Sequence, residues 1–313
     1  MKGLSISTFF TIKICTLITY GSAVLLWQYF TITSAIIPAP EDVIAPTIFL
    51  IGERKCGSSS LFKYLLKHPK IAPSMVKEPL HAAKIMFSQN YYSLFPKKDT
   101  SSFVFDWVDL IDEKIVKLPE NITIFEDTQT IDGSAKLFAT YKPEQLKRYT
   151  KGKAKIILAL RDPVERFISH FSMLQRFGSI KEEMEPFLAR TLHSNGTLPD
   201  VITAGLYFDR YSAWKQVFGD QMLLILTDWL TDTKKKMETL TEIFNFLELD
   251  PGAYDYGNKD LQTTFNVAPP KTIPSHLKQE LSSFYSNDVC LVQKTVFPGS
   301  PLPWETAKQC QAR

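Results

Sequence analysis

The sequence predicts an α/β fold of three layers, in which helices cover both faces of a parallel sheet. Two observations indicate this fold. A short apolar run rich in β-branched residues is followed by a polar turn and a helical pattern, and this order occurs at residues 47–66 and again at residues 155–171. Strands that alternate with helices pair in parallel because each helix carries the chain back to the same sheet edge. No Gly-, Ser- or Pro-rich linker interrupts residues 46–313, which predicts a single domain.

The first unit begins with an apolar strand, Thr47–Ile51, that leads into a polar turn over residues 52–60. Apolar residues then recur at Leu61, Phe62 and Leu65, which lie on one face of a helix. The second unit repeats this order. Its strand is Lys155–Leu160, its turn is 161–163, and its helix begins at a proline, which the first helical turn tolerates.

Other segments have weaker but similar patterns. A short strand is expected around Ile71, before a Glu-Pro turn. The further strand and helix candidates are Asn121–Phe125 and Met222–Leu226 as strands, and Tyr207–Phe218, Thr233–Leu247 and Ser275–Phe284 as helices.

The charge balance excludes some partners. With 36 Lys and Arg against 33 Asp and Glu, the net charge is +3. This excess is too small for a protein that binds nucleic acid through overall charge, so no nucleic-acid partner is expected. It remains compatible with a local basic cleft for a small anion.

The N-terminal segment is predicted to cross a membrane. Residues 14–37 contain no charged residue over 24 positions, enough for a helix to span about 30 Å of hydrocarbon. Cations precede the segment and acidic residues follow it, so residues 1–13 are expected in the cytosol, 38–45 as a stem and 46–313 in the lumen. A cleaved signal peptide is the alternative, but its apolar core is usually about 7–15 residues long.

The cysteines and sequons fit a lumenal domain. Cys15 lies in the predicted span and Cys56 in the first turn, which leaves Cys290 and Cys310 as a plausible disulfide. Asn121 and Asn195 begin Asn-X-Thr sequons that are usable only in the secretory pathway, which predicts a glycoprotein.

The first turn has the composition of an anion-binding loop. It offers two glycines, several hydroxyls, a cation at Lys55 and the N-terminus of the following helix. The spacing from Gly52 to Gly57 is that of a nucleotide P-loop, yet Ser58 stands where that loop has its lysine. A P-loop that hydrolyses ATP is therefore disfavoured. A solvated Arg54-Lys55 pair, with Ser58 as a helix cap, is the structural alternative.

The second turn offers a second site for a phosphate. Arg161 follows the strand directly, and Ser169 lies two turns into the helix. A guanidinium can bind phosphate oxygens in a bidentate manner while a hydroxyl donates to the same group.

These segments resemble a known family. PTIFLIGERKCGSSSLFKYLLKHP (46–69) is similar to the 5′-phosphosulfate-binding segment of Golgi carbohydrate sulfotransferases, and IILALRDPVERFISHF (156–171) to their 3′-phosphate-binding segment. Residues 204–226 resemble a further block of the family, particularly of the glycosaminoglycan-type enzymes. The resemblance covers roughly residues 46–250. It implies a P-loop-like sulfotransferase architecture and a type II Golgi membrane protein.

The resemblance also implies a reaction. The family transfers a sulfuryl group from 3′-phosphoadenosine-5′-phosphosulfate to a hydroxyl, less often an amine, of a glycan, and needs no metal. Lys55 would hold the leaving phosphate oxygen, Arg54 would add a cation, and Arg161 and Ser169 would bind the 3′-phosphate. The remaining donor-binding residues of the first turn would be Cys56, Gly57, Ser58, Ser59 and Ser60.

Glu78 stands at the family's position for the carboxylate that accepts the acceptor proton. His81 is a second candidate for that base or an acceptor contact. Two departures from the family pattern are visible. After the predicted strand 121–125 the expected lysine is replaced by Asp127, and the C-terminal donor loop lacks its basic motif, where Lys271 could substitute.

Two other functions compete with this hypothesis. A catalytically impaired sulfotransferase fold that only binds glycans would explain Asp127 and the altered loop. A nucleotide kinase would share the strand-turn-helix phosphate site, although the Gly-Lys-Ser order is missing.

Overall fold

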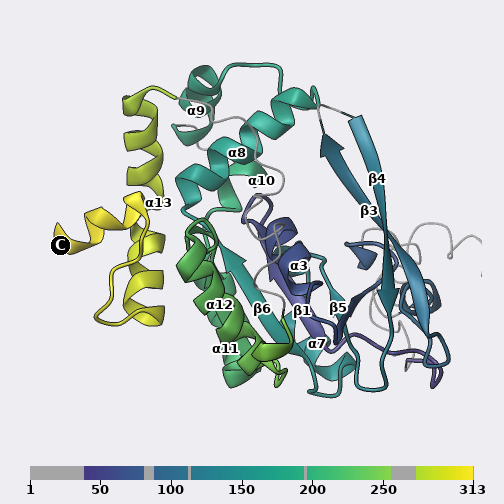
Figure 1. Cartoon of the computed structure of the whole chain (residues 1–313). Helices are drawn as coiled ribbons and strands as arrows, with labels where there is room; N and C mark the ends of the chain where they lie inside the picture. The colour runs from purple at the N-terminus through teal and green to yellow at the C-terminus, as the bar shows by residue number, and fades with distance from the viewer. Residues whose placement is uncertain (1–38, 81–87, 112–113, 194–195, 255–272, 313) are drawn as a thin grey trace, which may run out of the picture. The chain divides into compact units, whose positions relative to one another are not determined.

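Five parallel strands form the central sheet in the order β2-β5-β1-β6-β7 (Figure 1). The computed structural model describes residues 39–80, 88–111, 114–193, 196–254 and 273–312. All neighbouring strands of this sheet pair in parallel, which confirms the predicted α/β class. The strands are β1 (Ile48–Gly52), β2 (Ile71–Pro73), β5 (Gln129–Asp132), β6 (Lys155–Leu160) and β7 (Met222–Leu226).

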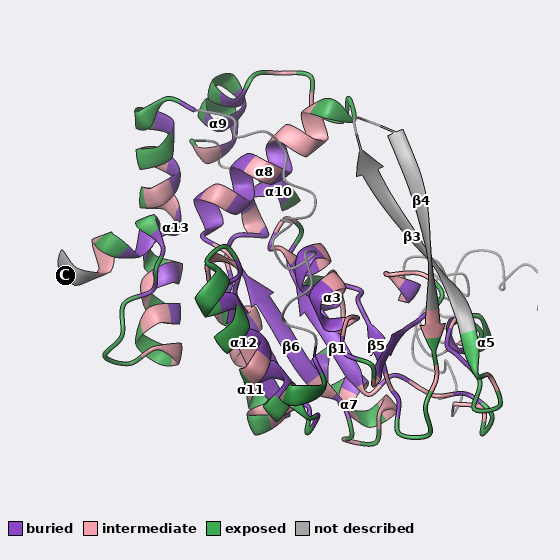
Figure 2. Ribbon diagram, viewed as in Figure 1, coloured by how far each residue is buried: buried purple, intermediate pink, exposed green. Residues whose placement is uncertain are grey.

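Alternate residues of β1 pack into two separate cores, one on each face of the sheet. Ile48 and Leu50 belong to the core beneath α3 (Ser58–Leu65) and α12 (Thr233–Phe246), which also contains Leu61 and Ile243. Phe49 and Ile51 belong to the opposite core. Figure 2 shows the buried strands between these helical layers. The period-two pattern of β1 thus produces the predicted three layers.

The second core is covered by helices from several parts of the chain. Phe167, Trp214 and Tyr285 are its large buried side chains. The helices that contribute to it include α6 (Leu137–Thr140), α7 (Pro143–Tyr149), α8 (Pro163–Arg176), α9 (Met184–Leu192), α10 (Asp200–Thr203), α11 (Phe208–Phe218) and α13 (Ser275–Val296). The other described elements are α5 (Gln89–Tyr92), η1 (Gly219–Gln221), η2 (Thr227–Leu230), η3 (Pro251–Ala253) and η5 (Glu305–Ala312).

The direction of winding reverses at β1. From β1 the chain passes to β2 at one edge of the sheet, and it then returns to β5 beside β1 before it crosses to β6 on the other side. In open α/β sheets, ligands bind at such a reversal, outside the carboxyl ends of the strands. The turns that follow β1 and β6 lie at this position.

The strand predicted at residues 121–125 is not part of the central sheet. Residues 121–123 end β4 (Lys114–Thr123), which pairs with β3 (Ser102–Ile111) in a separate antiparallel hairpin. The strand beside β1 is β5, whose sequence, QTID, has three polar residues out of four. Thr130 and Asp132 are nonetheless buried, because Thr130 donates to the carbonyl of Ile44 and Asp132 accepts from the Tyr91 hydroxyl.

The predicted disulfide is present. Cys290 on α13 is bonded to Cys310 on η5, with the Cα atoms 5.3 Å apart. Cys56 is a free, buried thiol.

In the part of the chain that the structure describes, none of the helices has the length and apolar character needed to cross a membrane. The predicted span at residues 14–37 lies outside these residues, as do His81, Asn195 and Lys271.

Gly52 allows β1 and β6 to approach closely, and we expect Gly52→Ala to be strongly destabilising. A Cβ at this position would lie 2.5 Å from the carbonyl oxygen of Ala159, a backbone atom in the centre of the sheet. Overpacking of this kind should lower the free energy of unfolding by about 3 kcal/mol. Urea denaturation followed by circular dichroism measures the loss.

Gly152→Ala is the matched control, because a Cβ there meets nothing within 4 Å and only the left-handed backbone (φ 73°) opposes it. Its cost should be about 1 kcal/mol. A smaller loss for Gly52→Ala than for Gly152→Ala would contradict the close-approach argument.

Candidate active site

The turn after β1 has a left-handed backbone conformation at two positions. Lys55 and Gly57 both have left-handed φ angles, 71° and 75°. A Cβ at residue 57 would lie 2.6 Å from Cγ2 of Thr227, so glycine is also required by space. Thr227 fixes the loop from the other side, since its hydroxyl lies 2.6 Å from the carbonyl oxygen of Cys56 and 3.0 Å from that of Leu160. One side chain therefore links the turn after β1 to the end of β6.

Gly57, not Ser58, is the N-cap of α3. It has no side chain with which to cap the helix, and Ser58 is the first helical residue. The alternative in which Ser58 caps the helix is therefore wrong. Ser58 and Ser60 are buried and Ser59 is half-buried. The first turn of α3 thus directs its N–H groups toward the carboxyl edge of the sheet, where an anion is favoured.

Cys56 contributes to the turn through packing. Its thiol is fully buried and lies 3.8 Å from the Tyr207 hydroxyl, and its N–H donates to the carbonyl of Glu53. Burial raises the pKa of Cys56 to about 11, so the thiol is neutral at physiological pH. Cys56, a predicted contact of the donor nucleotide, thus uses both its thiol and its N–H for contacts within the protein.

Cations gather beside the turn. Lys55 is half-buried and Arg54 exposed. Burial lowers the pKa of Lys55, and the positive charges of Arg176 and Arg161 lower it further. Burial also lowers the pKa of His170 to about 4, with contributions from Arg166 and Arg54, so that ring is neutral. The charge of Arg161 thus acts on Lys55, although the two residues belong to turns that are about 100 residues apart in the sequence.

Arg176 is a cation that the sequence reasoning missed. It is exposed in the last turn of α8, and its charge acts on Lys55 more strongly than that of Arg161 does. Ser169 lies seven residues earlier on α8, and this spacing of two helical turns places both on one face. Helical periodicity from Ser169 would have been the signal that identifies it.

The second turn is held by hydrogen bonds on both sides of Arg161. Its carbonyl accepts from the Tyr207 hydroxyl at 3.0 Å, and the next residue, Asp162, caps α8 by accepting from the N–H of Val164 at 2.8 Å. The Arg161 side chain is 32% exposed and lies 3.8 Å from a carboxylate oxygen of Glu165. A guanidinium in this position is accessible to a ligand from solvent.

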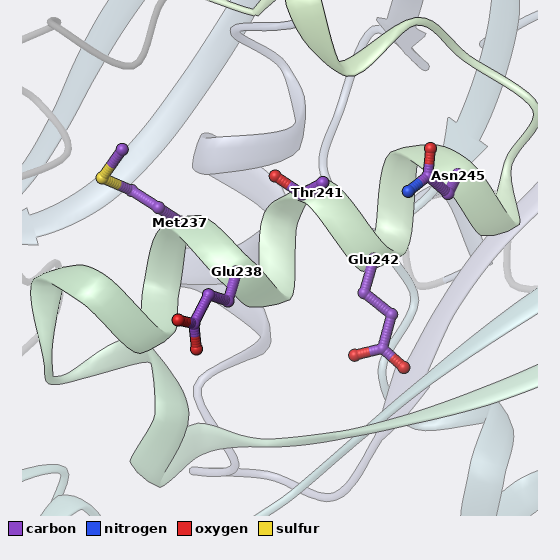
Figure 3. Close-up of a pocket in the computed structure, with 5 residues that line it drawn as sticks. All are labelled: Met237, Glu238, Thr241, Glu242 and Asn245. Atoms are coloured by element: carbon purple, nitrogen blue, oxygen red, sulfur yellow. The ribbon is translucent and has the colours of Figure 1, made fainter.

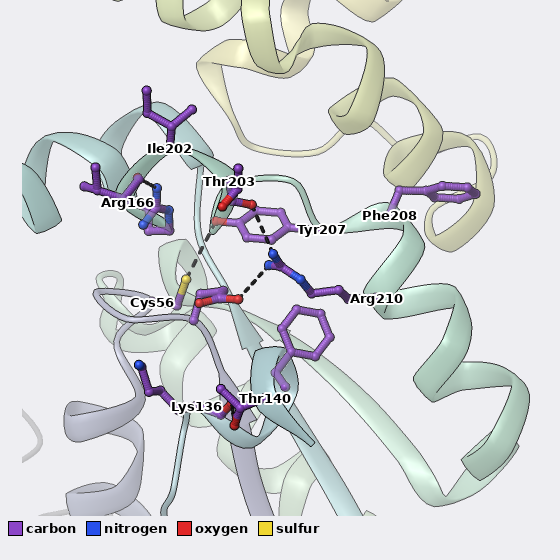
Figure 4. A network of polar contacts seen from close by, with 12 residues as sticks. Cys56, Lys136, Thr140, Arg166, Ile202, Thr203, Tyr207, Phe208 and Arg210 are labelled. Carbon is purple, nitrogen blue, oxygen red and sulfur yellow. Dashed lines mark hydrogen bonds and ion pairs between the residues drawn. The ribbon is translucent and has the colours of Figure 1, made fainter. Parts of the chain in front are cut away.

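A buried polar network lies beneath the turn (Figure 4). Glu53, the residue after β1, is ion-paired with Arg210 at 2.7 Å, and Arg210 also contacts the carbonyl of Thr203 at 3.3 Å. Arg166 is fully buried, donates to the carbonyl of Val201 and lies 3.3 Å from His170. Burial raises the pKa of Glu53, an effect that the Arg210 charge opposes. These partners come from distant segments of the chain, so no local sequence pattern connects them.

Glu78 lies at the carboxyl end of β5. Its side chain is 41% exposed and accepts from Lys77 Nζ at 3.2 Å. The residues around Glu78 are held beside the end of β5, because the Leu80 N–H donates to the Ser134 hydroxyl at 3.1 Å. The negative charge of Glu78 is also one of the causes that raise the pKa of buried Asp132, the chief cause being burial. Glu78 is therefore at the same sheet edge as the turns after β1 and β6.

Asp127 lies at the other edge of the sheet from Lys55 and Glu78. It precedes β5, and its carboxylate is ion-paired with exposed Lys70, which precedes β2. Both residues thus lie at the amino edge of the sheet, opposite to Lys55. Asp127 is therefore not placed to substitute for a lysine beside Lys55. The strand expected at residues 121–125 is present over residues 121–123, but it belongs to the β3–β4 hairpin and does not lead to the carboxyl edge of the central sheet.

A pocket of about 560 Å³ lies on α12 (Figure 3). Of the predicted site residues that the structure describes, none lines this pocket. The described residues that do are Met237, Glu238, Thr241, Glu242 and Asn245. Within the described ranges, no cluster of His, Cys, Asp and Glu is arranged to hold a metal ion.

Comparisons with known proteins agree with this architecture. Human carbohydrate sulfotransferase 15 is 24% identical over 261 residues, which cover 66% of this chain and 44% of that protein. The membrane-associated sulfotransferase kil1 of Dictyostelium discoideum is 34% identical over 132 residues, 41% of this chain and 23% of that protein. The chain thus spans less than half the length of these relatives.

A solved structure and a family model extend the comparison. The crystal structure of a sulfotransferase from Alicyclobacillus acidocaldarius superposes with a TM-score of 0.57 at 20% identity and covers 81% of this chain and 96% of its own, which supports the fold. The family model described as sulfotransferase domain matches residues 45–281, well over half of the sequence. The chain therefore belongs to the sulfotransferase domain family, and its relatives include carbohydrate sulfotransferases.

Proposed function

We propose that this chain transfers a sulfuryl group from 3′-phosphoadenosine-5′-phosphosulfate to a hydroxyl of a glycosaminoglycan-like glycan. The observation that carries the proposal is the adjacency of two basic turns. Gly52 and Ala159 are paired across β1 and β6, so Lys55 and Arg161 leave neighbouring strands at the same sheet edge. The donor carries phosphate groups at both ends of its ribose, and two such turns suit it.

Charge supports the same assignment. Lys55, Arg161 and Arg176 repel one another, which is why the two arginines lower the pKa of Lys55. A bound anion relieves this repulsion, so the turn is better suited to a ligand with several negative charges than to a neutral one. The uncapped start of α3 adds backbone N–H groups to the same site.

In the proposed step, the acceptor oxygen attacks sulfur in line with the bond to the leaving phosphate. The new S–O bond forms as the old one breaks, and the electron pair of the broken bond goes to the phosphate oxygen of 3′,5′-bisphosphoadenosine. Lys55 stabilises that developing charge. Glu78 accepts the acceptor proton, since it lies at the same edge of the sheet and is accessible.

We infer a Golgi membrane location with the catalytic domain in the lumen. The uncharged run at residues 14–37 would anchor the chain, and residues 1–13 would remain cytosolic. A disulfide between Cys290 and Cys310 fits an oxidising compartment.

The function is tested with sulfur-labelled donor on a glycan array, alongside binding to immobilised 3′,5′-bisphosphoadenosine. We expect labelled glycan and nucleotide binding. Binding without transfer to any glycan would favour a glycan-binding protein that has lost activity. Preference for ATP with magnesium, and phosphate transfer, would favour a nucleotide kinase and contradict the proposal.

Lys55→Ala should abolish most of the activity and leave the fold intact. Lys55 lies in a turn, and its charge is needed against the leaving phosphate, so its loss should lower kcat by about 10²–10³. Lys153→Ala is the matched control, because Lys153 is exposed before β6 at the opposite sheet edge. The assignment of the turn is wrong if folded Lys55→Ala retains most of its turnover.

Arg161→Ala should weaken binding of 3′,5′-bisphosphoadenosine by about 10- to 100-fold, the range of a charge-assisted hydrogen bond to phosphate. Binding of adenosine 5′-monophosphate, which lacks the 3′-phosphate, should change little. Isothermal titration calorimetry measures both, with exposed Arg148→Ala as the control. Equal losses for the two nucleotides would mean that Arg161 only supports the fold through Glu165.

Glu78→Gln should lower turnover by about 10²–10⁴ while nucleotide affinity stays the same. The amide keeps the shape of the side chain but cannot accept a proton. Glu126→Gln, at an exposed position beyond β4, is the control. His81→Ala is measured in parallel. An active Glu78→Gln together with an inactive His81→Ala would assign the base to His81.

A further inference from the structure

The C-terminal tail, residues 297–312, reaches the turn that carries Arg161. Thr306 of this tail is fully buried. Its N–H donates to Asp162 Oδ2 at 3.1 Å, and its hydroxyl lies 3.1 Å from each carboxylate oxygen of Asp162. These contacts join residues 144 positions apart in the sequence.

Asp162 connects Thr306 to the start of α8. The same carboxylate accepts from the N–H groups of Val164 and Glu165, which begin α8. Asp162 also follows Arg161 directly. Thr306 therefore fixes the carboxylate that sets where α8 starts, and thereby the direction in which the Arg161 side chain leaves the sheet.

A second route leads from the tail to Arg161. The Trp304 ring lies 6.0 Å, between centroids, from the Tyr207 ring, and the Tyr207 hydroxyl donates to the carbonyl of Arg161 at 3.0 Å. Trp304 Nε1–H donates to Asp228 Oδ2 at 3.0 Å, which ties the tail to the end of β7 as well. The two routes meet on residues 161 and 162.

The tail itself is fixed to α13. The Cys290–Cys310 disulfide closes it on one side of Thr306. On α13, Asp288 accepts from the N–H groups of Tyr207 and Phe208, so the helix that holds the disulfide also holds the tyrosine. The tail, α13 and Tyr207 form one connected support.

The Arg161 side chain needs such support. Its guanidinium is 3.8 Å from Glu165, a carboxylate that competes with any bound phosphate. Glu165 also contacts Lys278 of α13 at 3.1 Å, which draws it toward another cation. A small change in the start of α8 would alter the balance between the Glu165 contact and a ligand.

We propose that Thr306 is a positioning residue that holds the Arg161 turn in the geometry that binds the 3′-phosphate of the donor. The inference rests on the proposed function, because it presumes that Arg161 receives that phosphate. It assigns to the disulfide-closed tail a role in donor affinity.

The test compares Thr306→Val with Thr306→Ser. Valine keeps the shape of threonine and its N–H but removes the hydroxyl contacts to Asp162, whereas serine retains the hydroxyl. Affinities for 3′,5′-bisphosphoadenosine and adenosine 5′-monophosphate are measured by calorimetry. We expect Thr306→Val to lose about 10-fold for the bisphosphate, the value of one hydrogen bond to a charged group, and less than 2-fold for the monophosphate. Thr306→Ser should restore the wild-type ratio.

Lys308→Ala is the control in the tail, because Lys308 is exposed and ion-paired only with its neighbour Glu305 among the described contacts. Equal losses for both nucleotides in Thr306→Val, or no loss for either, would overturn the inference. If Thr306→Val does not fold, the Cys290→Ser/Cys310→Ser double variant decides, with the same selective loss expected for a freed tail and an unchanged ratio counting against the inference.

The two levels of the proposal fail differently. If the wild-type chain binds neither nucleotide, the proposed function is wrong and the inference falls with it. If the wild-type chain distinguishes the two nucleotides and folded Thr306→Val distinguishes them equally well, only the role of Thr306 is wrong.

Discussion

The rest of the site depends on the close backbone contact between β1 and β6. Because Gly52 has no side chain, β1 lies directly against the carbonyl of Ala159, and the turns that follow the two strands begin side by side. Thr227 then joins both turns through the carbonyls of Cys56 and Leu160. The positions of the basic side chains are thus set by the sheet, with loop residues only refining them.

Several cations lie close together at the site, and the buried carboxylate of Glu53 does not balance them. Glu53, the acidic residue of the turn after β1, is buried and ion-paired with Arg210. Its charge is therefore directed to Arg210 and not to Lys55. Lys55 in turn has a lowered pKa because burial and two arginines oppose its charge. In the function that we propose, the negative charge of the donor would remove this repulsion between the cations.

The sequence predicts the elements whose signal is local. Apart from Lys155 at the start of β6, the strands β1, β6 and β7 are apolar, and the turns after the first two carry Lys55 and Arg161, so these parts could be predicted. β5 could not, because Thr130 and Asp132 look exposed in sequence and become buried only through Ile44 and Tyr91. The same limit applies to Arg176, whose relation to Lys55 depends on the direction of α8, and to Thr306, whose partner lies 144 residues away.

The burial of Cys56 has a consequence for oxidative folding. Thiol–disulfide exchange proceeds through the thiolate, and with a pKa of about 11 only about one Cys56 in 10⁴ is ionised at neutral pH. Solvent and oxidant also have no access to a fully buried sulfur. Once β1 and α3 have packed together, the Cys56 thiol can no longer compete for a disulfide partner. Among the described cysteines only Cys290 and Cys310 then remain to be joined.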